Sequence, residues 1–449
     1  MQSRRNFVKN SLKGTALLAF GSTVPGFLAS TASAAATGKE KILVLVELTG
    51  GNDGLNTVVP FGDDLYHKAR PKIGLKTEDL LKIDDHAGLH GAMRPLEPML
   101  KNGHVSVLPG IGYPNPNRSH FESMDVWHTA DPRRKLQDGW LGRSIGSLKL
   151  QEGRVPAFHI SKEQLPLALQ GSGIGIPTIH ADKPFDLDFT GDPQPRTQST
   201  QFNPFGTAPG KLLSTIDVKS ETYQQRKALI SELADLDWNP ENDAYQFVRR
   251  TSLNTYTTID QLREIIHGEF TTPQAQYEQI GRAYLPVREG LGYELLLAAR
   301  MIAADFGTRI YYLSIAGFDT HSAQQSTHQQ LLQKVATAIS QFYLQLANSR
   351  DAERVLLVTY SEFGRRVSEN NSLGTDHGAG SCMLAFGPAV KGGIVGKHPS
   401  LEADQLTEGD LKYHTDFRQV YATILDKWLE CDSRRVLGEE FEHVDFLGS

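Results

Sequence analysis

"KILVLVELTGGNDGLNTVVP", residues 41–60, is the stretch that decides the fold. It begins with a nearly continuous run of valine, leucine and isoleucine, which is typical of a strand covered on both faces of a parallel sheet. The glycines that follow let the backbone turn sharply and leave Asn52 and Asp53 at the strand tip. Ligands of open α/β sheets bind at such carboxyl ends, so a site is expected here. The alternative is a plain turn, since Asn, Asp and Gly are the usual turn residues.

The C-terminal third repeats this kind of strand in alternation with helices. Residues 293–307 predict a helix, 308–318 a strand, 329–349 an amphipathic helix and 354–365 another strand. This is the β-α-β pattern of a parallel sheet. We therefore expect an α/β fold with a mostly parallel central sheet sandwiched by helices. A last helix, "TDFRQVYATILDKWLE", follows, and Asp416 is expected to cap it.

Length and composition describe a soluble globular protein. At 449 residues the chain is interpreted as a single domain over residues 35–449, with a cap or insertion of loops and helices at about 150–285. The net charge of -6, without long blocks of one sign, gives no footprint for nucleic acid. Cys382 and Cys431 could form one disulfide or remain two unpaired thiols.

The N-terminus predicts export. "SRRNFVK", residues 3–9, precedes an interrupted apolar run at 14–30 and the A-x-A pattern that ends at Ala34. Residues 1–34 are interpreted as a twin-arginine signal peptide, which places the mature protein in the periplasm or outside the cell. An uncleaved anchor is the alternative, but the run is short for a membrane span, so none is expected after cleavage. Because this route carries folded proteins, often with a metal or cofactor, a metalloprotein is favoured.

Acids and histidines cluster at the predicted strand tips. Carboxylates and neutral imidazoles coordinate divalent ions, and clustered acids need cations nearby. The sequence therefore predicts a site for one or two divalent metals. The competing interpretation of "GTDHG", residues 374–378, is an acid and a histidine that only bond nearby backbone. The candidate ligands are Asp53, Asp319, His321, Glu362, Asp376 and His377.

A further candidate lies at the start of a predicted helix in "NPNRSHFESMDVWHT", residues 115–129. Arg118, Ser119 and His120 fall near its N-terminus, where backbone N–H donors and the helix dipole favour an anion or a nucleophile that becomes one. Ser119 is also an ordinary N-cap residue.

Five segments together resemble a known family. They are "ELTGGNDGLNTVVP", "NRSHFESMDVWHT", "GFDTH", "VTYSEFGRRVSENNSLGTDHG" and "TDFRQVYATILDKWL". The set resembles the exported bacterial family catalogued as domain of unknown function 1501, and the likeness runs from about Lys41 to Trp428. That family is remotely similar to the alkaline phosphatase and sulfatase superfamily, which implies an alkaline-phosphatase-like α/β sandwich with metals at strand ends and a nucleophile at a helix N-terminus.

The resemblance also implies roles for individual residues. Asp53 matches the metal-binding acid after the first strand, and Ser119 falls where the nucleophile sits. Asp319 and His321 match an Asp and His pair on a late strand tip, and His377, with Asp376, matches the late loop histidine.

This chain departs from the superfamily pattern in two places. The spacing in "DTH" is narrower, and Ser361 and Glu362 stand where an Asp-His pair is usual. Glu362 could replace the acid but nothing replaces the histidine, which leaves a one-metal or altered site open beside a two-metal site.

The implied activity is metal-assisted hydrolysis of phosphate or sulfate esters. Ser119 would attack a small or polymeric anionic ester, and Arg118 or Arg365 would stabilise charge on the transferring group. The ion would be zinc, calcium, magnesium or manganese. The alternative is an exported binding or assembly protein that kept the scaffold without turnover, because fold alone does not fix function.

Overall fold

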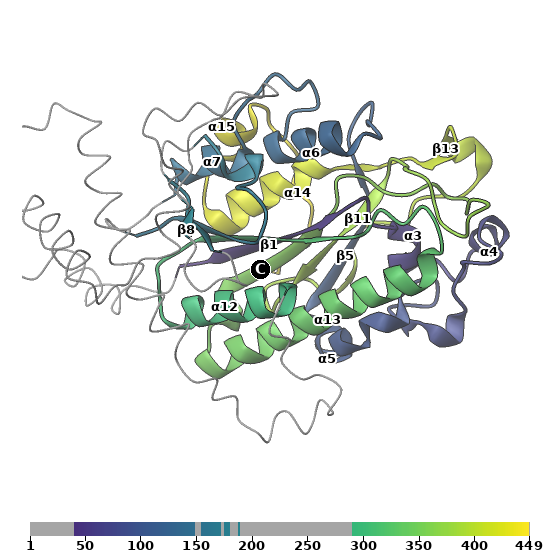
Figure 1. Ribbon diagram of the computed structural model, residues 1–449, viewed down its shortest axis with the longest axis horizontal. Coiled ribbons are helices and arrows are strands. Elements are labelled where there is room, and N and C mark those ends of the chain that lie inside the picture. Colours follow the sequence, from purple (N-terminus) through teal and green to yellow (C-terminus); the bar gives the residue numbers. More distant parts are fainter. Residues whose placement is uncertain (1–39, 149–153, 172–174, 180–186, 189–289, 449) are drawn as a thin grey trace, which may run out of the picture.

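A computed structural model describes residues 40–148, 154–171, 175–179, 187–188 and 290–448 (Figure 1). The expected signal peptide at 1–34, the mature start near Ala35 and most of the expected insertion at about 150–285 lie outside the described residues.

A ten-stranded sheet forms the centre of the described chain, and strands β10, β1 and β9 lie at its middle. These three are parallel, with Ile42 opposite Val355 and Leu43 opposite Ile310. Strands β8 and β11 are antiparallel to their neighbours, so the sheet is mostly parallel, as predicted. Its strands are β1 (Ile42–Thr49), β5 (Val105–Gly112), β6 (Ala157–Ile160), β7 (Thr178–Ile179), β8 (Leu187–Asp188), β9 (Ile310–Ala316), β10 (Val355–Tyr360), β11 (Ser381–Phe386), β12 (Gly393–Ile394) and β15 (Thr415–Asp416).

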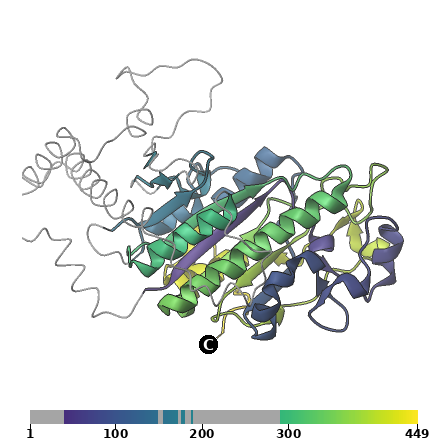
Figure 2. The same cartoon turned by 60° about the horizontal axis from the view of Figure 1, so that its bottom comes forward.

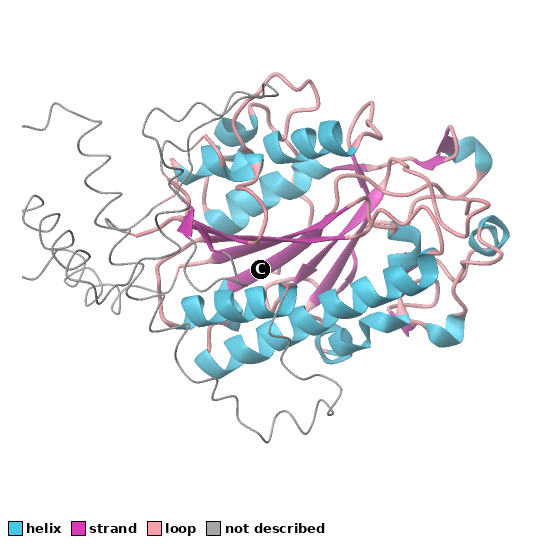
Figure 3. Cartoon of the chain, in the orientation of Figure 1, coloured by secondary structure: helices cyan, strands magenta, loops and turns pink. Residues whose placement is uncertain are grey.

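Helices cover both faces of this sheet (Figures 1 and 3). Strand β1 explains why, because its alternate side chains point to opposite faces and are apolar on both: Val44 and Val46 join one core cluster, and Leu43 and Leu45 join the other. The first face carries α5 (Glu97–Lys101), α12 (Leu291–Ala303) and α13 (Gln324–Ser349), the last two side by side in Figure 2. The second carries α6 (His120–Thr129), α7 (Trp140–Ile145), α14 (Phe417–Thr423), the π-helix η6 (Ile424–Leu429) and α15 (Ser433–Leu437).

Short elements complete the described chain. Two small sheets are formed by β2 (Val58–Val59), β3 (Leu81–Lys82) and β4 (Gly88–Leu89), and by β13 (Leu406–Thr407) and β14 (Asp410–Leu411). The short helices are α3 (Gly54–Thr57), α4 (Asp64–Ala69), η1 (Thr77–Asp79), η2 (Gly91–Leu96), η3 (Leu167–Leu169), η4 (Ala352–Arg354) and η5 (Ala403–Gln405).

The predicted elements of the C-terminal third are present. Asp416 caps α14 through a capping box with Gln419, as expected. Strand β6 lies within the range expected for the insertion, yet it pairs with β9 in the main sheet. Cys382 and Cys431 are buried and unpaired, and no helix of the described residues is long and apolar enough to cross a membrane.

Strand β11 was not expected from the sequence, and it shapes the site. It returns antiparallel between β10 and β5, so the chain from Ser361 to Gly380 must loop out at the carboxyl end of β10 and come back. Within this loop a β-bridge joins Arg365 to His377. The loop therefore brings the segment "SEFGR", residues 361–365, which contains the candidates Glu362 and Arg365, next to "GTDHG".

Candidate metal centre

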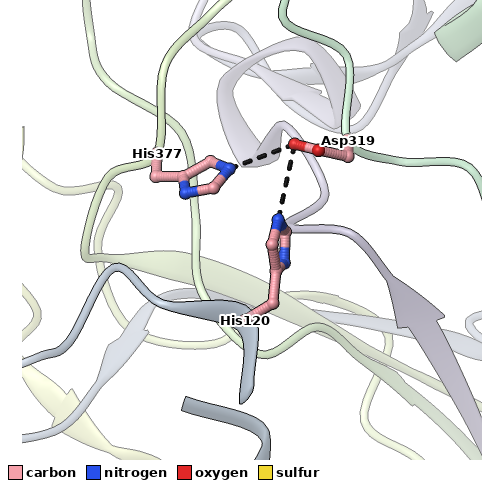
Figure 4. A group of neighbouring side chains, drawn as sticks. All are labelled: His120, Asp319 and His377. Carbon is pink, nitrogen blue, oxygen red and sulfur yellow. Dashed lines mark hydrogen bonds and ion pairs between the residues drawn. The ribbon is translucent and has the colours of Figure 1, made fainter. Parts of the chain in front are cut away.

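Three side chains from distant segments meet beyond the carboxyl ends of the central strands. His120 is the first residue of α6, Asp319 follows β9, and His377 lies in the loop between β10 and β11. One ligand atom from each lies within 4.8 Å of the other two (Figure 4). Asp319, His321, Asp376 and His377 of the predicted set gather here, whereas His120 was not among the predicted ligands.

The Oδ1 atom of Asp319 is the centre of the group. It lies 3.1 Å from His377 Nε2, 3.0 Å from His321 Nε2 and 3.5 Å from His120 Nε2. The Nε2 atoms of His321 and His377 are 2.9 Å apart. Three imidazoles thus present the same ring nitrogen to one carboxylate oxygen.

In two of these histidines the second ring nitrogen, Nδ1, contacts an oxygen atom of the protein. His120 Nδ1 lies 2.8 Å from Glu362 Oε1, and His377 Nδ1 lies 2.8 Å from the carbonyl oxygen of Arg118. Since a carbonyl or carboxylate oxygen accepts, each Nδ1 carries a proton, and in the neutral, metal-binding form of the imidazole each Nε2 keeps its lone pair. Such partners typically orient metal-binding histidines.

Glu362 therefore lies behind His120. Its Oε1 also accepts from the Gly50 amide at 2.9 Å, its Oε2 accepts from Ser361 Oγ at 3.0 Å, and the residue is fully buried. The hydrogen bond with Glu362 raises the pKa of His120. The sequence predicted Glu362 as a candidate ligand; in the structure its carboxylate contacts the His120 ring and is not part of the group of His120, Asp319 and His377.

His321 and Asp376 form the exposed rim of the group. Asp376 Oδ1 lies 3.4 Å from His321 Nδ1 and accepts a hydrogen bond from the side-chain amide of Asn370 at 3.1 Å. The hydrogen bond from Asn370, and a smaller one from His321, lower the pKa of Asp376. Asp376 thus supports His321 more weakly than Glu362 supports His120.

The donor set fits a divalent ion. Neutral imidazoles with Nδ1 protonated would point their Nε2 lone pairs at each other and at a carboxylate, an arrangement that a bound cation would stabilise. In a tetrahedral site with bonds of about 2.0–2.1 Å, the edges between ligand atoms are about 3.3 Å. The separations around Asp319 Oδ1, from 3.0 to 3.5 Å, bracket that value.

Arg365 is buried beside the group, and all three of its guanidinium nitrogens donate hydrogen bonds. Its guanidinium donates to the carbonyls of Gly50, Gly51, Phe318 and Thr375 and, at 2.7 Å, to Asp319 Oδ1. Burial alone would raise the pKa of Asp319, but hydrogen bonds from Arg365 and His377 outweigh it and lower the pKa to about 2. Arg365 was one of two arginines expected to stabilise charge on the transferring group; in the structure its guanidinium bonds three strand-tip loops and Asp319.

Arg118 is likewise bonded within the protein. Its Nε and Nη2 atoms lie 2.9 and 2.6 Å from Asp410 Oδ2, on the β13–β14 hairpin. The guanidinium is thus turned to this hairpin, while the Arg118 carbonyl holds His377.

Ser119 occupies the N-cap position of α6, as both sequence interpretations required. It is partly buried, and its side chain makes no capping hydrogen bond. Its chain neighbours are Arg118, whose carbonyl holds His377, and His120. Its backbone is therefore fixed between two parts of the candidate metal centre.

Asp53 belongs to a separate buried network. Its Oδ2 forms a fully buried ion pair with Arg70 Nη1 at 2.7 Å and accepts a hydrogen bond from the Gln324 side chain. Its Oδ1 accepts a hydrogen bond from the backbone N–H of Asn56 at 3.2 Å. Burial alone would raise the pKa of Asp53, but Arg70 and the other partners lower it below the usual value. The structure does not bring Asp53 into the group of His120, Asp319 and His377.

His120 is the member of this group that the sequence interpretation did not include among the candidate ligands. The signal was present in "NRSHFES", where a histidine begins a helix beside the candidate nucleophile. What the pattern does not reveal is the buried acid, 242 positions away in sequence, that turns the His120 ring.

Comparison with solved structures finds distant likenesses. The PsFucS1 sulfatase from Pseudoalteromonas sp. is 11% identical, with a TM-score of 0.34, over 92% of this chain and 72% of that one. Ps i-CgsB is 8% identical, with a TM-score of 0.31, over 79% and 68%. The PH0037 protein from Pyrococcus horikoshii is 11% identical, with a TM-score of 0.27, over 78% and 88%. At such scores the likeness carries no information about activity.

No curated protein matches this chain. A family model does, over residues 40–441, in agreement with the resemblance found in the sequence motifs. The chain belongs to the family described as "Protein of unknown function (DUF1501)".

Proposed function

We propose that this protein is a metal-dependent hydrolase of phosphate or sulfate esters, exported by the twin-arginine route, with Ser119 as its nucleophile. The observation that carries the proposal is the position of Ser119 at the N-cap of α6, next to His120 of the candidate metal centre. His120, Asp319 and His377 would hold the ion, with His321 at the rim. A divalent ion bound there supplies polarisation of an ester oxygen and a lowered pKa for a nearby hydroxyl.

The first turn of α6 supports the same role. Because the Ser119 side chain makes no capping bond, it leaves the amides of this turn without the usual side-chain acceptor. Such amides bind phosphate and sulfate oxygens well, and the helix dipole adds to the attraction. With Arg118 and Arg365 bonded internally, these amides take over the charge stabilisation that the sequence prediction gave to the two arginines.

Glu362 and the Arg118 carbonyl contribute by fixing the imidazoles. Each accepts an Nδ1–H, so that the Nε2 atoms face the ion without a change of ring orientation. Arg365 contributes by fixing the position of the Asp319 carboxylate through a hydrogen bond that also lowers its pKa.

One observation favours a second candidate function. Both arginines that were expected to contact an anionic ester are bonded within the protein. An exported binding or assembly protein that uses the metal centre structurally would need neither of them. Metal binding without turnover is the result that this alternative predicts.

The test combines metal content with turnover on wild type and Ser119→Ala. Protein exported and purified without chelator is assayed by mass spectrometry for metals and on aryl phosphate and aryl sulfate esters. The hydrolase proposal expects bound metal in both proteins and turnover lost only in Ser119→Ala. Ser349→Ala, a partly buried serine at the end of α13, is the matched control and should keep wild-type activity. A metal-loaded wild type that hydrolyses no ester refutes the proposal in favour of the binding protein.

A further inference from the structure

We infer that the candidate metal centre takes a single ion of the zinc type, one that prefers imidazole, and not a pair of ions or calcium or magnesium. This inference rests on the proposed function only in taking the same group of side chains as the metal centre. The sequence left open whether one or two ions bind, and whether they are zinc, calcium, magnesium or manganese. The inference reduces these choices to one ion of the zinc type.

The kind of ligand selects the kind of ion. Nitrogen atoms predominate, since His120, His377 and His321 all turn Nε2 toward one carboxylate oxygen of Asp319. Imidazole suits zinc and its neighbours among the transition metals, whereas calcium and magnesium need six or more oxygen ligands or retained waters. The described residues of this group offer one central carboxylate with Asp376 at the rim, which is too few oxygens for a calcium site.

The acids that a second ion would need are already bonded to protein groups. Asp53 is paired with Arg70 with both side chains fully buried. Glu362 accepts from His120, from the Gly50 amide and from Ser361, so neither of its oxygens is free of a protein donor. Binding a second ion through either acid would break a buried, charge-assisted contact, which is strongly unfavourable.

Arg365 stands beside Asp319 as a fixed cation. Its Nη2 lies 2.7 Å from Asp319 Oδ1, and the rest of the guanidinium is anchored on backbone carbonyls of three loops. A second divalent ion on Asp319 would face this buried positive charge at close range, and the two like charges would repel each other. The guanidinium thus leaves Asp319 able to serve one ion.

The test counts and identifies ions on the folded wild-type protein, stripped with chelator and then reloaded. We expect one equivalent of zinc by mass spectrometry, zinc that calcium or magnesium in excess does not displace, and a cobalt-loaded protein with the visible absorption of a four- or five-coordinate site. His120→Gln and His377→Gln should each weaken zinc binding by more than about tenfold, since even partners behind the ligands are worth 10–100-fold. His67→Gln changes an exposed histidine of α4 and should bind zinc as the wild type does.

Two equivalents of tightly held ion, displacement of zinc by calcium or magnesium, or unchanged zinc affinity in both histidine variants would each overturn the inference. The outcome is separable from the fate of the hydrolase. Ester hydrolysis with two bound ions would support the proposed function and refute the single-ion inference. One bound zinc without turnover on any ester would support the single-ion inference and refute the proposed function.

Discussion

The substitution Glu362→Gln tests whether Glu362 orients the candidate ligand His120 or binds the metal ion itself. The change preserves shape but removes the negative charge behind His120. The glutamine Oε1 can still accept from His120 Nδ1 and from the Gly50 amide, which now lie 2.8 and 2.9 Å from Glu362 Oε1. Its Nε2 can donate to Ser361 Oγ, now 3.0 Å from Glu362 Oε2. The fold and the ring orientation should therefore survive.

The expected effect is an intermediate loss of metal affinity. Removing the partner behind a metal-binding histidine typically weakens binding by about 10–100-fold, or about 1.4–2.7 kcal/mol. The reason is that an uncharged partner makes the imidazole a poorer electron donor. If Glu362 were a direct ligand, the substitution would cause a larger loss of metal affinity. If its carboxylate were unrelated to the site, the metal affinity would not change.

The assay is competition for zinc between the protein and a chromophoric chelator, for wild type, Glu362→Gln and Glu369→Gln. Glu369 is the control because its carboxylate accepts from the backbone amides of Lys72 and Ile73, away from the candidate ligands. Unchanged affinity in Glu362→Gln refutes the reasoning. Complete loss of zinc there, with zinc retained in His120→Ala, refutes it in the opposite direction and makes Glu362 the ligand.

Two further changes test the framework around the site. Arg70→Met leaves Asp53 as an unpaired buried carboxylate, so urea unfolding at pH 7 should show a loss of about 3–5 kcal/mol. The pKa of Asp53 is lowered in the folded protein, so in the wild type its ionised carboxylate stabilises the fold above the ordinary carboxyl pKa, and this stabilisation is lost as the pH falls through the folded-state pKa. The difference in unfolding free energy between wild type and Arg70→Met should therefore be largest at neutral pH and shrink in acid. A deficit that does not change with pH would contradict this account. Gly50→Ala puts a Cβ atom 2.4 Å from the Asp319 backbone nitrogen at φ +119°, and it should release metal at concentrations that saturate the wild type. The control Gly103→Ala has φ +73° and no heavy atom within 4 Å, so it should keep its metal and lose only about 1–2 kcal/mol of stability; equal metal affinity in both variants would count against the clash.

The sequence predicted the fold because the central strands carry their own signal. Strand β1 is apolar on both faces, and β9 and β10 show the same pattern with a helical segment between them. Strand β11 was missed because "SCMLAF" is short and follows directly on a loop. Its antiparallel direction comes from pairing with β5 and β10, which are distant in sequence.

The candidate site was predicted in composition more than in arrangement. Strand-tip position alone predicted that Asp319 and His377 lie close together, because the ends of parallel strands converge. The roles of Glu362 and Arg365 depend on partners more than forty positions away, such as His120 and Asp319. Asp53 pairs with Arg70, a residue in a loop that shows no motif. Residue type therefore indicated which chemistry was available, and only the long-range contacts decided which acids were free for it.

The order of the strands has a consequence for how the protein is made. Strand β1 ends at Thr49, but its neighbours in the sheet begin at Ile310 and Val355. At about 5–20 residues per second, the ribosome delivers the second neighbour roughly 15–60 s after β1. During synthesis the strongly apolar strand β1 thus stays without its two neighbours, so both of its edges are unpaired, which is a hazard for aggregation. Folding must be largely post-translational, and a nascent chain that stops before β10 is a substrate for chaperones and proteases.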